Sequence, residues 1–251
     1  MLPSKLRDRS SSGPITPLST RPAYVRNSRL AFNLQGFPPF EPRMAGWEDR
    51  DDECEGSECH GALVELSRED YERVWLSEGG GTDNPSYEEF VVDAIPYGDG
   101  GEPVKAIALR VRDGKRVPDG PPSKRYMEML ISGAKEIQLT DVYVKKLEAV
   151  KTESPSRILK FVGYYNFFLT SVLWRMRTTG RLKGFSNVNM KVTNALFFGR
   201  SNQALKFLSD VSLLLWMLPG SVIGAMIRLT MFVRGVEVSP MIKAVFADDK
   251  K

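Results

Sequence analysis

Between residues 24 and 111, apolar and polar positions repeatedly follow the period of a β-strand, in which successive side chains point to opposite faces. Strand-like runs lie at 24–25, 30–34, 61–66, 88–96 and 105–111. The last two runs are joined by Gly98-Asp99-Gly100-Gly101, which is typical of a turn. They are therefore predicted to form an antiparallel hairpin, and the whole stretch a twisted sheet with short helices at its rim.

Three short helices are predicted where a serine or threonine precedes residues with helical spacing. These caps are Ser67, before a helix from about Arg68 to Ser77; Ser123, before a helix to about Gln138; and Thr140, before a last short helix. The middle helix should bury a stripe made of Tyr126, Leu130, Ala134 and Ile137. By this pattern alone, Tyr126 is a core residue.

Charge divides the chain into two physically different parts. Residues 1–149 hold 20 lysines and arginines against 26 acidic residues, a net charge of −6, whereas residues 150–251 hold 15 against 5, a net charge of +10. Residues 1–22 are polar and contain four prolines. We expect a flexible N-terminal segment over 1–19, an α+β domain over 20–150 and a basic, apolar helical tail over 151–251.

Two long stretches of the tail carry no charged residue. They are Phe161–Trp174, flanked by basic residues, and Val211–Ile227, which Pro219-Gly220-Ser221 interrupts. Neither reaches the roughly 20 apolar residues that span a bilayer. The pattern predicts insertion at a membrane surface or a re-entrant hairpin through 157–234, with two core helices of a small soluble domain as the alternative. Nucleic-acid binding is not expected, because the basic residues are dispersed and form no binding motif.

The acidic connection from Trp47 to Glu58 contains Cys54, and Cys59 and His60 follow it. Two cysteines make no disulfide framework, and the spacing matches no structural zinc site. The simplest interpretation is two loop thiols in an intracellular protein.

The stretch Leu76-Ser77-Glu78-Gly79-Gly80-Gly81 places one carboxylate at the predicted end of a helix, where glycines allow a sharp turn and close approach to a ligand. By itself, Glu78 is most simply an ordinary solvated residue at a helix terminus. The elements on either side make it a candidate for proton transfer.

Those elements, taken in order, resemble the γ-glutamylcyclotransferase-like family over about residues 20–150. The residues that carry the resemblance are Gly61 to Asp70, Glu78-Gly79, Tyr87, Pro122 to Tyr126, Gly133 to Glu136 and Tyr143. The segment from Arg29 to Pro38 also resembles the subgroup with a membrane-associated C-terminal extension. The fold implied is α+β, a mixed or antiparallel sheet forming a partial barrel with short helices, followed here by apolar C-terminal helices.

The resemblance implies a reaction in which the α-amine of a γ-glutamyl substrate attacks its own γ-carbonyl, releasing 5-oxoproline and an amine or peptide. Glu78 matches the family's general acid/base, Tyr126 and Ser123 match its Pro-Ser-x-x-Tyr element, and Tyr87 is a weaker substrate-binding candidate. No metal or organic cofactor is implied. Whether the substrate is glutathione, another peptide or an amine adduct stays open.

One family element is absent from these 251 residues: a first strand ending in Tyr-Gly-Ser-Asn, whose loop supplies donors to the γ-glutamyl group. We expect either a start site placed too late or true loss of the loop. If the chain begins at Met1 in the cell, activity should be weak or absent. The alternative function is then a catalytically inactive, membrane-associated binding module.

Overall fold

The computed structural model describes residues 6, 14–37, 39–50, 58–98, 101–175, 188–189, 191–193, 195–196 and 203–235. Its contacts divide the chain into two compact units, one containing 1–36 and 41–154 and the other containing 37–40 and 155–251. Each unit is described separately below.

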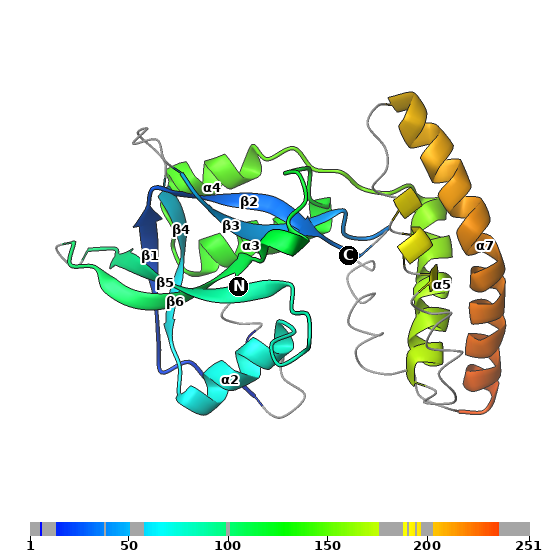
Figure 1. Ribbon diagram of the computed structural model, residues 1–251, viewed down its shortest axis with the longest axis horizontal. Helices are drawn as coiled ribbons and strands as arrows, with labels where there is room; N and C mark the ends of the chain where they lie inside the picture. The colour runs from blue at the N-terminus through cyan, green and yellow to red at the C-terminus, as the bar shows by residue number, and fades with distance from the viewer. Residues whose placement is uncertain are drawn as a thin grey trace. The chain divides into compact units, whose positions relative to one another are not determined.

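The first unit is an α+β structure (Figure 1). Its elements are β1 (Ser19–Arg26), β2 (Ser28–Gln35), β3 (Arg43–Asp49), β4 (Glu58–Glu65), α2 (Arg68–Ser77), β5 (Tyr87–Pro96), β6 (Val104–Val111), a 3₁₀ turn η1 (Asp113–Lys115), α3 (Lys124–Glu136) and α4 (Asp141–Glu148). The strands pair antiparallel in two sheets, ordered β4-β1-β5-β6 and β2-β3. Together they curl into the half-barrel that the sequence predicts.

The core of this unit lies between β2 and the helices α3 and α4. Its buried side chains are Phe32, Met127, Ala134, Leu139, Tyr143, Val144 and Leu147, and the predicted stripe of α3 packs against them. The three predicted caps are all present. The side chains of Ser67, Ser123 and Thr140 each accept a hydrogen bond from the backbone N–H of the residue three positions later in the chain. The hairpin β5–β6 is confirmed as well.

One predicted loop is wrong in part. Trp47 to Asp49 belong to β3, and Cys59 and His60 belong to β4, so neither Cys59 nor His60 lies in a loop. The reason is long-range pairing: β4 runs antiparallel to β1 from Glu58, which is paired with Arg26, to Glu65, which is paired with Ser19. Cys54 lies outside the described residues.

The second unit contains α5 (Arg157–Arg175) and α7 (Gln203–Val233), which pack side by side (Figure 1). The short segment 37–40 belongs to this unit, because Phe37 and Phe40 both make edge-to-face contacts with Phe167 of α5. The break expected at Pro219 is absent, and α7 is one continuous helix of 31 residues.

Candidate functional site

Glu78 directly follows α2 and is its C-cap residue. Its backbone N–H donates to the carbonyls of Val74 and Trp75, each at 3.1 Å, and the residue is half-buried. Each of the three following glycines suits the turn. Gly79 and Gly81 have φ values of +89° and +76°, which favour glycine, and a Cβ on Gly80 would lie 2.2 Å from the Trp75 indole. The glycine run therefore fixes where the chain leaves the helix and where Glu78 is held.

Tyr87 and Tyr126, both predicted to bind substrate, meet at the same residue of β3. The Tyr87 hydroxyl donates to the carbonyl oxygen of Ala45 at 2.9 Å, and the Ala45 N–H donates to the Tyr126 hydroxyl at 3.2 Å. The Tyr126 ring also packs edge-to-face on Phe32. The structure thus brings β5 and α3 together at Ala45, and it gives Tyr126 the core role that its helical spacing predicts.

Ser123 is buried and its hydroxyl is engaged in the fold. It accepts the backbone N–H of Tyr126 at 3.0 Å and donates to the carboxylate of Glu41 at 2.5 Å. The same carboxylate accepts two bonds from the guanidinium of Arg125. This arrangement fixes the first turn of α3 and hence the position of Tyr126. Sequence reasoning missed Glu41, because its partners lie more than 80 residues away and it stands in a proline-rich loop.

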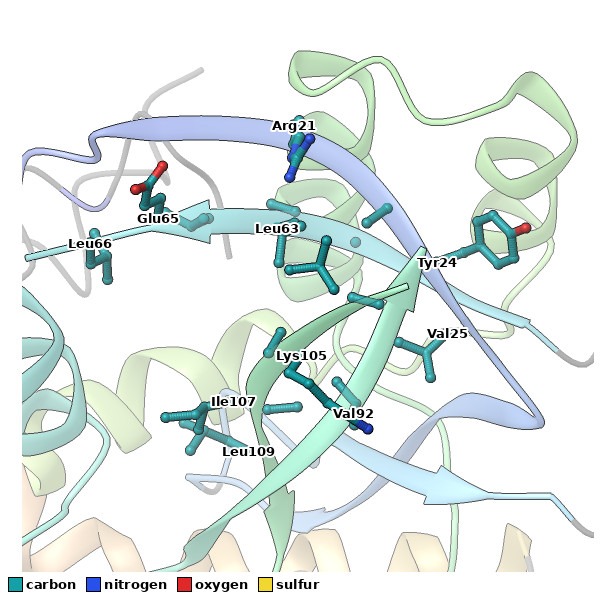
Figure 2. Close-up of a pocket in the computed structure, with 18 of the residues that line it drawn as sticks. Arg21, Tyr24, Val25, Leu63, Glu65, Leu66, Val92, Lys105, Ile107 and Leu109 are labelled. Atoms are coloured by element: carbon teal, nitrogen blue, oxygen red, sulfur yellow. The ribbon is translucent and has the colours of Figure 1, made fainter. Parts of the chain in front are cut away.

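A pocket of about 610 Å³ lies beside α2 and the sheet (Figure 2). Every residue from 61 to 66 and from 104 to 109 borders it, so it follows the backbone edges of β4 and β6 as well as their faces. Those two strands are the edges of the four-stranded sheet among the described residues. The walls are mainly apolar, and the charged side chains are Arg21, Glu65 and Lys105.

The predicted site residues Glu78, Tyr87, Ser123 and Tyr126 are not among the described residues that line this pocket. Tyr71 and Val74 of α2 do line it. Val74 precedes Glu78 by one helical turn, so the two residues share a face of the helix. The pocket therefore borders the helix that precedes Glu78 without including Glu78 itself.

At another part of its wall, the pocket meets a cluster of aromatic and ionisable groups around His60. The imidazole stacks between the rings of Tyr24 and Tyr143, with centroids 5.5 and 4.4 Å away. Its Nδ1 contacts the Tyr97 hydroxyl, and its Nε2 lies 3.3 Å from a carboxylate oxygen of Glu58. The alternation of apolar and polar residues along β4 does not reveal this cluster, because His60 is the one residue of β4 whose ring belongs to it.

Burial dominates the electrostatics of this cluster. Desolvation lowers the pKa of His60, and the neighbouring Glu58 opposes that shift. Desolvation raises the pKa of the Cys59 thiol to about 11. It likewise raises the pKa of the Tyr143 hydroxyl, which lies 3.9 Å from the Cys59 sulfur. These shifts favour the neutral forms of all three groups near pH 7, which suits a packed structural cluster.

Among the described residues, no group of three or more histidine, cysteine, aspartate or glutamate side chains is placed to hold a metal ion.

The sequence was also compared with known proteins. No family model matches the chain. It is 30% identical over 162 residues to the gamma-glutamyl cyclotransferase gliK of Claviceps purpurea, an alignment that covers 64% of this chain and 70% of that relative. This chain therefore belongs to the gamma-glutamyl cyclotransferase family, as the resemblance in its sequence predicts.

Two solved structures are also similar. One is a gamma-glutamyl cyclotransferase, 16% identical, with a TM-score of 0.49, covering 64% of this chain and 91% of the other. The second is an uncharacterized protein from Homo sapiens, 17% identical, with a TM-score of 0.46, covering 58% of this chain and 85% of the other.

Proposed function

We propose that the protein cyclises the γ-glutamyl group of a peptide or amine substrate to 5-oxoproline, with Glu78 as general acid/base. The observation that carries this proposal is the position of Glu78 in a member of this family. The residue is the C-cap of α2 and precedes a glycine run in which the positive φ values of Gly79 and Gly81 favour glycine. A carboxylate held at a fixed point is what a proton shuttle needs.

The proposed reaction balances with one carboxylate. Glu78 takes a proton from the substrate's α-ammonium group, and the freed amine forms a bond to the γ-carbonyl carbon. Glu78 then gives this proton to the leaving nitrogen, the tetrahedral intermediate collapses and the bond to that nitrogen breaks. The ring nitrogen passes its remaining extra proton to the released amine, which departs as an ammonium group. The products are 5-oxoproline and the free amine or peptide.

Tyr87 and Tyr126 are proposed to contact the substrate, because their hydroxyls meet at Ala45 and come from two different elements. Ser123 is proposed to act through the fold: its capping bond fixes the turn of α3 that carries Tyr126.

The product identifies the reaction. Purified full-length protein should convert γ-glutamyl dipeptides to 5-oxoproline, whereas a hydrolase would release glutamate from the same substrates. Detection of glutamate in place of 5-oxoproline would contradict the proposal. Binding of a γ-glutamyl peptide without any turnover would instead support the rival function, an inactive binding module.

We also propose that residues 157–234 hold the protein at a membrane. One helix, Phe207–Val233, is long and apolar enough to cross a bilayer by length and composition. The net charge of +10 over residues 150–251 favours anionic lipid surfaces. Flotation with anionic liposomes should be lost on truncation after Ser154, which keeps the bond between Glu153 and Pro122. Unchanged flotation would refute the membrane anchor.

A further inference from the structure

The continuity of α7 changes what this helix can do in a membrane. Pro219 lies within the helix and is exposed. It removes a single backbone N–H donor, so the backbone hydrogen bonds of the turns on both sides can keep the helix continuous. At 1.5 Å per residue, the 27 residues from Phe207 to Val233 extend about 40 Å, more than the roughly 30 Å of a bilayer's hydrocarbon core. The helix is therefore long enough to span.

One narrow side of α7 packs against α5 through small residues. A Cβ on Gly224 would lie 2.3 Å from the carbonyl oxygen of Tyr165, and a Cβ on Gly220 would lie 3.5 Å from the Asn166 amide. Between them, the Ser221 hydroxyl lies 2.7 Å from the Val162 carbonyl oxygen. Small residues at this spacing let two helix backbones approach closely, as helices in membranes do.

Apart from this side, where Leu213 and Met217 are also buried, most of the α7 surface is apolar and exposed. Its exposed large side chains are Phe207, Leu208, Val211, Leu215, Trp216, Leu218, Val222, Ile223, Met226, Leu229, Phe232 and Val233. No charged residue lies between Asp210 and Arg228. A helix that lies in the plane of a membrane surface needs a polar face toward water, and this stretch of α7 offers none. The surface of this stretch that α5 does not cover is therefore poorly suited to water.

Polar groups on the α5 side already have partners. Asn189 donates to Asn166 at 2.8 Å and to Thr170 at 3.0 Å, and the Trp216 indole N–H donates to the Asn189 side-chain oxygen at 3.1 Å. At the far end of the charge-free stretch, the Arg228 guanidinium lies 4.9 Å from the centre of the Tyr164 ring. These contacts satisfy the requirement that polar groups at membrane depth bond to one another.

We propose that α7 crosses a lipid bilayer, with Gly220, Ser221 and Gly224 packed against α5 and its opposite face in contact with the acyl chains. This inference rests on the membrane association proposed above and replaces surface insertion with a span. Asp210 and Arg228, which bound the charge-free stretch, then lie near the two interfaces, where long charged side chains reach the headgroups.

The span is tested by labelling the two ends of α7. Full-length protein with Cys54→Ser and Cys59→Ser is made in microsomes with a single cysteine, Leu208→Cys or Phe232→Cys, at positions that are both exposed. A membrane-impermeant maleimide should label one cysteine in intact microsomes and the other only after detergent is added. Labelling of both, or protection of both, in intact microsomes would overturn the span.

The packing against α5 is tested by a disulfide between Val162→Cys and Ser221→Cys in the same background. Gly224→Leu should abolish this crosslink, because it places a side chain against the Tyr165 carbonyl, whereas Val222→Leu on the exposed face should leave it unchanged. A crosslink that survives Gly224→Leu would overturn the packing. Failure to associate with membranes at all would refute the anchor itself, and neither result bears on 5-oxoproline formation.

Discussion

Replacing Glu41 by glutamine tests the contact that fixes the start of α3. Glu41 is 7% exposed, and its carboxylate accepts hydrogen bonds from the Ser123 hydroxyl at 2.5 Å and from the Arg125 guanidinium at 2.5 and 3.0 Å. Glutamine keeps the shape but replaces one oxygen by an NH₂ group and removes the charge. One of the two partners must then face a donor or lose its bond.

The size of the effect follows from these contacts. A hydrogen bond to a charged group contributes about 1.5–3 kcal/mol, but the Arg125 side chain is 45% exposed, so solvent screens its share. We expect the free energy of unfolding to fall by about 2 kcal/mol in total. For a protein of this size, that loss lowers Tm by roughly 4–8 °C.

Thermal unfolding followed by circular dichroism measures the change. Glu128→Gln is the matched control, because Glu128 lies on the same helix, is exposed and approaches Lys124 only at 3.8 Å. The control should change the free energy of unfolding by less than about 0.5 kcal/mol. If Glu41→Gln unfolds at the same temperature as the parent protein, the carboxylate does not hold α3 as argued.

Three further predictions concern β3 and β4. Burial lowers the pKa of His60 in the folded protein, so the unfolded chain takes up a proton first, and the free energy of unfolding should fall as the pH drops below about 6.5. An NMR titration of this single histidine in the folded protein should have its midpoint below that pH. A midpoint above it would contradict the lowered pKa. Burial raises the pKa of the Cys59 thiol to about 11. In a Cys54→Ser variant, this thiol should therefore react with maleimide far more slowly in the folded protein than in urea. Equal reaction rates would be inconsistent with its burial. Gly46→Ala should lower the free energy of unfolding by about 1–3 kcal/mol, because the new Cβ would lie 2.1 Å from the Asn33 side-chain oxygen. Gly61→Ala should leave it nearly unchanged, because nothing lies within 4 Å of a Cβ there. Equal unfolding midpoints for the two variants would refute the close packing at Gly46.

Local signals in the sequence predict much of the fold. The Ser67 cap, the helix that follows it and the β5–β6 hairpin depend on residues close together in the chain, and all are confirmed. Where distant pairing decides, the prediction fails. The start of β4 at Glu58 is set by β1, more than 30 residues earlier, and an acidic run conceals it.

In the candidate site too, local features could be predicted from the sequence and contacts between distant residues could not. The glycine run after Glu78 identifies a constrained turn, and the structure confirms that constraint. The meeting of Tyr87 and Tyr126 at Ala45 could not be predicted, because Ala45 has no chemistry of its own and serves only through its backbone. The continuity of α7 through Pro219 was also missed, because local propensity underestimates how far packing against α5 supports a helix.

The role of Glu78 is tested most directly by the rate of 5-oxoproline formation in Glu78→Gln. Removing a general acid/base should lower this rate by about 10²–10⁴-fold. Glu69→Gln, an exposed acidic residue in the first turn of the same helix, should leave it unchanged. A rate in Glu78→Gln equal to that of the parent enzyme would contradict the assignment of Glu78 as the proton shuttle.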